Sequence, residues 1–398
     1  MHLALGAMQS GYRWIRIDAA AICTTSCVRV DGGMSFPSSG YIPSLDGLRA
    51  VSILIVFVSH AGLGHLVPGG FGVTVFFFIS GFLITVLLCR EFDRFGKISF
   101  KAFYVRRALR LMPPLFIALG TATALVVLGF INVKLDTPTL AAQVLFLSNY
   151  YQIYGNSQSI PGLGVLWSLA VEEHFYLIWP MVFLMVARQR IGLRLLAVAA
   201  VAFLAWRIIR YSLLGTSDTA IYYLSDTRLD SLLYGCLLAL MMWRGVLPIF
   251  NYSAPSLLAR NALIAIAIIG ILATFVIRDD TFRSTWRYSI QGLALMPIFF
   301  FAVTHPNALL FRPLNWRFVR FLGVLSYSIY LVHNVILQML FERLSGGEET
   351  VWAAMLAAGM SVGYAALVYR SVDLPSIRIR GLLTGHPKRT STDGVATL

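Results

Sequence analysis

Ten long apolar stretches, separated by charged or turn-forming residues, constrain this chain more than any other feature. A helix needs roughly 20 apolar residues to cross a bilayer, and fewer where it borders a cavity. The composition agrees, because 58% of residues are hydrophobic and 13% are charged, whereas soluble domains carry about 25% charged residues. The sequence therefore predicts an all-α, polytopic membrane helix bundle. The predicted spans are 46–62, 69–89, 109–131, 164–187, 191–206, 230–243, 261–277, 288–304, 320–341 and 350–370.

The basic residues predict the orientation of this bundle. With the N-terminus inside, 24 of the 32 Lys and Arg residues fall in inner segments. Inner loops of membrane proteins carry such an excess, so ten spans with both ends cytoplasmic are expected. The net charge of +14 is then mostly membrane topology, and nucleic acid is not an expected partner.

The chain divides into one membrane domain and two polar ends. Residues 41–383 are predicted to form the domain. Residues 1–40, in which arginines interrupt every apolar stretch, are predicted to be a disordered extension or to precede a true start at Met34. Residues 384–398 are expected to be a disordered cytoplasmic tail. The four cysteines lack the paired spacing of a zinc site, so no metal is expected.

The first predicted span carries a stripe of ionisable residues that is energetically costly inside a bilayer. At about 100° per residue, Asp46, Arg49 and His60 lie within about 60° of one helix face. Ionisable groups persist inside a bilayer mainly where they border a cavity or do chemistry. A histidine near neutral pH can take a proton from a hydroxyl and pass it to a leaving group. When His60 is considered alone, a structural role explains it equally well: an interfacial histidine that donates a hydrogen bond to a backbone carbonyl.

Three arginines follow the second span at helical spacing. Arg106, Arg107 and Arg110 are predicted to share one side of a helical turn, on the cytoplasmic side. Arginine forks match phosphate oxygens, so the patch suits a phosphate-bearing ligand. Ordinary positive-inside anchoring is the simpler explanation of the patch taken alone.

The fourth span opens with two neighbouring acids. Glu172 and Glu173 point about 100° apart, so they are not expected to share a proton as a carboxylate pair. Ser168 lies on the same face as Glu172, four residues earlier. A buried carboxylate suggests a role for Glu172, whereas a solvated interfacial position suits Glu173 better.

Two further polar groups occur in later spans. Arg228 and Asp230 are two residues apart, so each is expected to meet another helix in a structural role. Ser326, Tyr330 and His333 recur at four and three residues, which predicts one polar stripe. This stripe either lines a cavity or makes hydrogen bonds between helices.

Six motifs, in order and spacing, resemble the membrane acyltransferase-3 family of O-acyltransferases. They are LDGLRAVSILIVFVSH, GGFGVTVFFFISGFLIT, YVRRALRLMPP, LWSLAVEEHFYLIWP, RLDSLLYG and LGVLSYSIYLVHN. The resemblance implies about ten helices in the inner (plasma) membrane. It also implies transfer of an acyl group, most often acetyl, from cytoplasmic acyl-CoA to a hydroxyl of a carbohydrate or lipid-linked glycan. Acyl-CoA is then a co-substrate, with no permanently bound cofactor and no metal.

The resemblance also assigns residues. It implies that His60 is the catalytic histidine, with Glu172 as a second catalytic residue, and that Arg49 helps to bind the acyl donor. The basic loop expected to hold the CoA phosphates contains Arg106, Arg107 and Arg110. Two features depart from the family: Asp373 stands where a glutamate is common, and no hydrolase-like domain follows the last span. A second soluble domain, if the reaction needs one, is expected on another chain.

Two other classes of protein compete with this interpretation. A transporter or flippase of a glycan or lipid-linked precursor also shows intramembrane charge and proline breaks, here Pro113, Pro114, Pro180 and Pro297. The second half of the chain, however, does not repeat the His60 helix. A polysaccharide-binding accessory protein would leave His60 dispensable.

Overall fold

The computed structural model describes residues 29–30, 33–34, 42–155, 160, 162–246 and 257–383. Within these ranges the chain is helical apart from short turns and a two-residue antiparallel hairpin, β1 (Arg29–Val30) and β2 (Gly33–Met34). The predicted all-α class is therefore confirmed. Apart from this hairpin, the extension predicted at 1–40 lies outside the described residues, and so does the tail at 384–398.

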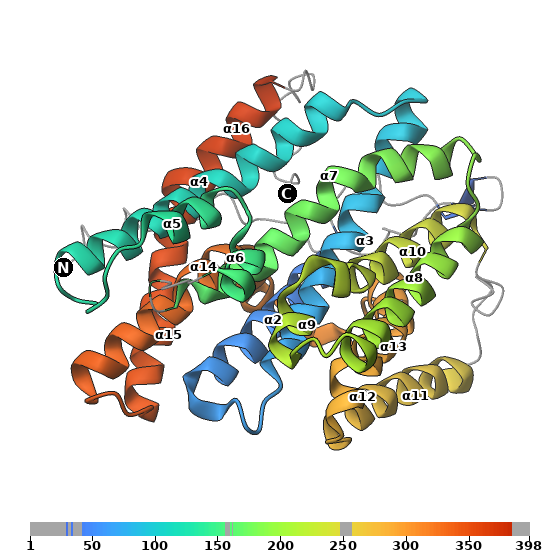
Figure 1. Ribbon diagram of the computed structural model, residues 1–398. Helices are drawn as coiled ribbons and strands as arrows, with labels where there is room; N and C mark the ends of the chain where they lie inside the picture. Colours follow the sequence, from blue (N-terminus) through green and yellow to red (C-terminus); the bar gives the residue numbers. More distant parts are fainter. Residues whose placement is uncertain are drawn as a thin grey trace.

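The helices form a tilted bundle (Figure 1). The long helices are α2 (Pro43–Val58), α3 (Gly69–Phe95), α4 (Phe100–Val127), α7 (Trp167–Ala187), α8 (Leu193–Ile208), α10 (Leu229–Arg244), α11 (Leu257–Val276), α13 (Trp286–Thr304), α14 (Arg317–Leu344) and α15 (Val351–Val368). The short ones are η2 (Ser59–Leu63), α5 (Thr137–Val144), α6 (Ser148–Tyr154), η3 (Leu163–Leu166), η4 (Ile209–Leu213), α9 (Asp218–Tyr223), η5 (Ser225–Thr227), α12 (Asp280–Ser284), η7 (Arg312–Asn315), η8 (Tyr369–Asp373) and α16 (Leu374–Leu383).

Eight helices of the described chain are long and apolar enough to cross a membrane. Each of the ten predicted spans coincides with a helix, but α8 and α10 are not among these eight. Helix α10 has 16 residues and, at 1.5 Å per residue, is about 24 Å long, shorter than a typical hydrocarbon core of about 30 Å. The count of ten and the sides of the two ends therefore stay predictions.

Helices α3 and α14 form the centre of the bundle. The most apolar windows of both are 72% buried, against 22% for α11 and 28% for the stretch from α15 to α16. In Figure 1, α11 and α15 lie at the edges of the molecule. Their outward residues are large and apolar, such as Leu258 and Met355, which are 81% and 71% exposed. These faces suit lipid, which leaves polar contacts to the centre of the bundle.

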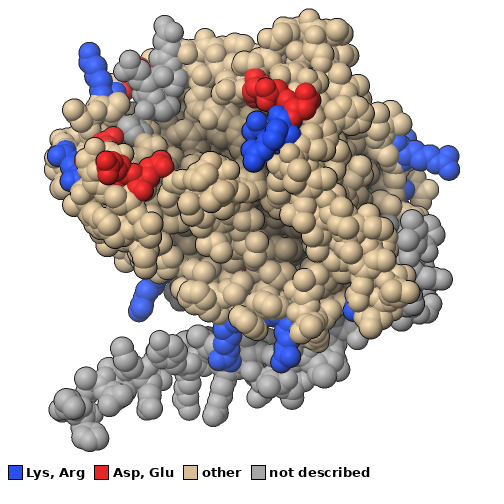
Figure 2. Space-filling view, turned by 90° about the horizontal axis from the view of Figure 1, so that it is seen from below, with Lys and Arg blue, Asp and Glu red and all other residues tan. Residues whose placement is uncertain are grey.

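Figure 2 looks at the end of the bundle where, in Figure 1, η2, α12 and the beginning of α15 lie. Charged side chains form only a few small groups on this face, and the surface is hollowed near its centre.

Helices α2 and α14 cross at very short range. A Cβ atom added to Gly323 of α14 would lie 1.9 Å from the backbone oxygen of Asp46 in α2. Since no side chain fits at that distance, the crossing requires glycine. Small residues allow this kind of close backbone approach between membrane helices. The crossing brings the C-terminal halves of α2 and α14 together, where η2, which continues α2, and α14 each carry a histidine.

The histidine of α2 lies where that helix changes form. His60 belongs to η2, a π-helical turn that continues α2 directly. Gly62 has φ +97°, a left-handed conformation that favours glycine, and it ends the helix two residues later. Single π turns recur at functional sites because they displace one side chain from the regular helix face.

Replacement of Gly323 by valine tests the crossing. The added atoms would meet the Asp46 carbonyl, so Gly323→Val should lower stability by about 1–3 kcal/mol or more, as overpacked cores do. The thermal unfolding midpoint of the detergent-solubilised protein measures this loss. Gly359→Val in α15 is the matched control, because nothing lies within 4 Å of the added Cβ. Equal midpoints for the two variants would contradict the close crossing.

Candidate active site

A cavity opens among α2, α3, α4, α7 and α14. Its empty space is about 700 Å³, a figure that includes open solvent at the mouth. Basic side chains from α2 and α4 line it, namely Arg49, Arg107 and Arg110. The apolar part of the wall includes Val73, Phe76, Phe77, Leu83, Leu111 and Leu169. The cavity therefore offers positive charge beside an apolar wall.

Two of these arginines have unused hydrogen-bond donors. Arg49 Nε and Arg107 Nη2 are buried and lack a hydrogen-bond partner within the described chain. The Arg107 guanidinium also lies 4.7 Å from the centre of the Tyr176 ring, which holds it by a cation–π contact. A buried guanidinium nitrogen without a partner is costly, so an anionic ligand would stabilise these groups.

The structure separates Arg106 from the other two arginines. Arg106 Nη2 lies 2.6 Å from Glu91 Oε2 of α3, and Arg106 does not line the cavity. The expectation that all three share one side is therefore wrong. Neighbouring helical positions differ by about 100°, which lets Arg107 face the cavity while Arg106 faces α3.

Glu172 lies in the cavity wall and is held by two hydroxyl groups. Its carboxylate accepts hydrogen bonds from Ser80 of α3 at 3.0 Å and from Tyr176 of α7 at 2.8 Å. Glu173 does not line the cavity, so the two acids diverge as their spacing predicts. Ser80 and Tyr176 were missed at the sequence level, although Tyr176 follows Glu172 by one helical turn.

Ser168, Ser326 and Tyr330 also line the cavity. The Tyr330 hydroxyl donates to the backbone oxygen of Val165 at 2.9 Å and lies 2.6 Å from Ser168 Oγ. This contact joins α14 to the beginning of α7. The polar stripe of α14 thus both lines the cavity and makes hydrogen bonds between helices, so the two explanations offered for it are compatible.

His60 and His333 meet where α2 and α14 run side by side. His60 Nδ1 lies 3.0 Å from His333 Nε2, although the two residues are 273 positions apart. His333 is 0% exposed, whereas His60 is exposed on its other side. Neither lines the cavity, which corrects the cavity-lining alternative for His333. The ring of Tyr330 lies 5.7 Å from that of His333, so cavity and histidine pair adjoin at Tyr330.

Asp46 does not share the surroundings of Arg49 and His60. It is 4% exposed and lies in the first turn of α2, where that helix packs against α14. Asp46 is absent from the cavity wall. The polar stripe of α2 is therefore divided along the helix axis into a packed end, an arginine in the cavity and a histidine beyond it.

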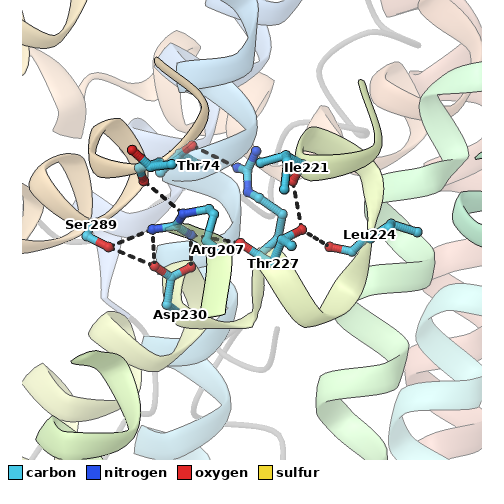
Figure 3. A network of polar contacts seen from close by, with 9 residues as sticks. Thr74, Arg207, Ile221, Leu224, Thr227, Asp230 and Ser289 are labelled. Atoms are coloured by element: carbon cyan, nitrogen blue, oxygen red, sulfur yellow. Dashed lines mark hydrogen bonds and ion pairs between the residues drawn. The ribbon is translucent and has the colours of Figure 1, made fainter. Parts of the chain in front are cut away.

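A second polar cluster lies away from the cavity. Arg207 of α8 donates to both carboxylate oxygens of Asp230 at 3.0 and 2.9 Å and to Ser289 Oγ of α13 at 2.7 Å. Figure 3 shows Arg207 between Asp230 and Ser289, with Thr227 bonded to the carbonyls of Ile221 and Leu224. Arg207 was missed as a partner, although it is an arginine at the end of an apolar run.

Arg228 is held mainly by aromatic rings. Its guanidinium lies 4.0 Å from the Tyr288 ring centre and 5.1 Å from that of Tyr222, and its Nη2 donates to Thr74 of α3 at 3.1 Å. Arg228 and Asp230 thus meet different helices, as their spacing predicts, and both lie outside the cavity wall.

Comparison with known proteins assigns the family. The acyltransferase-3 family profile, described as an acyltransferase domain, matches residues 42–370. The chain belongs to this family.

Relatives in two bacterial species are similar over most of the chain. A Staphylococcus aureus (strain COL) protein with an O-acetyltransferase name is 31% identical over 368 residues, covering 87% of this chain and 59% of the relative. The peptidoglycan O-acetyltransferase OatA of Listeria monocytogenes (strain EGD-e) is 29% identical and covers 87% and 57%. The O-acetyltransferase OatA of S. aureus (strain NCTC 8325) is 30% identical and covers 86% and 58%. The chain therefore spans less than two thirds of these relatives. No solved structure matches it.

The buried ion pair predicts a large effect of a single substitution. Asp230→Ala would leave Arg207 buried without its carboxylate, which should destabilise the protein by about 3–5 kcal/mol. Asp280→Ala is the control, because its pair with Arg283 is exposed, at 3.5 Å, and is expected to contribute about 0–1 kcal/mol. Thermal unfolding midpoints compare the two variants. A small, equal loss in both would show that the Arg207–Asp230 pair does not stabilise the bundle.

Proposed function

We propose that this chain is a multi-pass O-acyltransferase of the inner (plasma) membrane. It would take an acyl group, acetyl in the first instance, from cytoplasmic acyl-CoA and place it on a hydroxyl of an envelope glycan. Family membership supports the reaction class. The names of the relatives, one of which acts on peptidoglycan, support acetyl as the acyl group and a cell-wall glycan as the acceptor.

The observation that carries the proposal is the cavity and the histidine pair meeting at Tyr330. Arg49, Arg107 and Arg110 offer guanidinium groups to the phosphates of CoA, and the apolar wall suits the pantetheine and acyl parts. Arg49 and His60 are 11 residues apart on one helix, about 16 Å along its axis. An extended donor lying along α2 would thus have its phosphates near Arg49 and its thioester toward His60.

His60 would serve as the general base in this reaction. The acceptor hydroxyl gives its proton to His60 and attacks the thioester carbonyl, and the tetrahedral intermediate then breaks the carbon–sulfur bond. The departing thiolate takes the proton back from His60, so no proton is gained or lost. Glu172, which lines the cavity and is held by Ser80 and Tyr176, is the second proposed catalytic residue. A covalent acyl-histidine intermediate is the alternative route, and ping-pong kinetics would identify it.

Loss of His60 should abolish most of the transfer. With labelled acetyl-CoA and membranes containing the acceptor glycan, His60→Ala should reduce label in the glycan about 10²–10⁴-fold, the usual contribution of a general base. His65→Ala is the matched control, because His65 is an exposed turn residue five positions later. The catalytic assignment of His60 is wrong if His60→Ala transfers label as fast as the control.

The three arginines of α4 should separate into two groups. Arg107→Ala and Arg110→Ala each remove a cavity charge, so the KM for acetyl-CoA should rise about tenfold or more, as loss of a charged hydrogen bond implies. Arg106→Ala should leave this KM nearly unchanged, because Arg106 pairs with Glu91 outside the cavity. An equal rise in all three variants would place the donor elsewhere than in this cavity.

A further inference from the structure

The hydrogen bonds of His333 determine where its own proton lies. His333 Nδ1 lies 2.8 Å from the backbone oxygen of Tyr330 and 3.2 Å from that of Ile329. A carbonyl oxygen only accepts hydrogen bonds, so Nδ1 of His333 must carry a hydrogen. In a neutral imidazole the other nitrogen is then bare. His333 Nε2 is therefore an acceptor.

The same logic passes to His60. Since His333 Nε2 accepts, the hydrogen of the 3.0 Å contact must belong to His60 Nδ1. Neutral His60 consequently has a bare Nε2, on the ring edge that His333 does not occupy. Within the part of the chain that the structure describes, His333 contacts two backbone carbonyls, His60 and the rings of Phe57 and Tyr330. These surroundings contain no carboxylate to balance a charged His333, and burying an unpaired charge is costly.

We propose that His333 is a positioning residue, which holds His60 in the Nδ1–H tautomer and leaves Nε2 as the atom that takes the proton. The kinetic consequence rests on the proposed function, but the tautomer does not. The acceptor hydroxyl would give its proton to His60 Nε2, and the CoA thiolate would take it back. His60 Nδ1–H stays bonded to His333 throughout, so His333 stabilises the transient imidazolium without receiving a proton. A third group that orients a catalytic histidine in this way strongly affects rate.

Three substitutions of His333 test whether this position must supply a hydrogen-bond acceptor to His60, or only a polar or bulky side chain. In His333→Gln the amide oxygen can reach the former position of Nε2, so kcat should stay within about tenfold of the wild type. In His333→Asn the amide is one methylene shorter and lies near the former Nδ1, and His333→Leu has no acceptor. Both should lower kcat about 100-fold, in line with the loss of a correctly oriented base. The KM for acetyl-CoA should not change, because the cavity arginines remain.

The rates are measured with labelled acetyl-CoA and membranes containing the full chain. The comparison of Gln with Asn keeps the test valid if the Leu variant does not fold, because both retain a polar amide at the buried position. Equal rates in the wild type, Gln and Asn forms would overturn the positioning role.

Nitrogen-15 NMR of the histidine-labelled protein in detergent tests the tautomer without any activity. The spectrum of the wild type minus that of His60→Ala identifies the His60 signals among the seven histidines. We expect Nδ1 protonated and Nε2 bare in the wild type, and loss of this preference in His333→Asn. A bare Nδ1 in the wild type would overturn the proposal. The expected tautomer in a protein that transfers no label would instead contradict the proposed function and leave the tautomer assignment standing.

Discussion

The crossing of α2 and α14 at Gly323 is the contact on which the candidate site depends. It brings two backbones so close that only glycine fits, and it fixes how the two helices run beyond that point. His60 and His333 can then meet at hydrogen-bond distance, and Tyr330, one helical turn before His333, lies next to the cavity. In lipid, tight packing replaces the hydrophobic driving force between helices. The geometry of the site therefore follows from backbone packing in the bundle.

Charged groups inside this bundle fall into two kinds. Arg207 and Asp230 are fully buried and paired, and Arg207 also donates to Ser289 and to the backbone oxygens of Thr227 and Thr285, which is the pattern of a structural pair. Arg49 and Arg107 face a cavity, and each has a buried guanidinium nitrogen without a hydrogen-bond partner in the described chain. This is the pattern expected of a site that binds an anion. Position in the cavity wall separates the two roles, because Arg228 also has buried donors without a hydrogen-bond partner in the described chain but lies outside that wall.

The sequence predicted the elements well and the side-chain partners less well. Apolar runs identified every long helix, because hydropathy at membrane length is a strong signal. The ionisable residues of α2 and α7 were also identified from the sequence as candidate site residues, because charge in an apolar run is rare. The partners could not be predicted, because they join distant segments. Examples are His60 with His333 and Arg207 with Asp230. Arg106 was misplaced because helical spacing gives an arc of positions but not the neighbour that each side chain meets.

We propose that the arginine-lined cavity and the histidine pair form one path, along which an acyl group passes from a cytoplasmic donor to an envelope glycan. The most direct measurement uses sealed, inverted membrane vesicles containing the acceptor glycan inside and labelled acetyl-CoA, which does not cross membranes, outside. We expect label on glycan in the vesicle interior, and we expect this label to be lost when either His60 or Arg110 is replaced by alanine. Label appearing only on glycan added outside, with none inside, would contradict it.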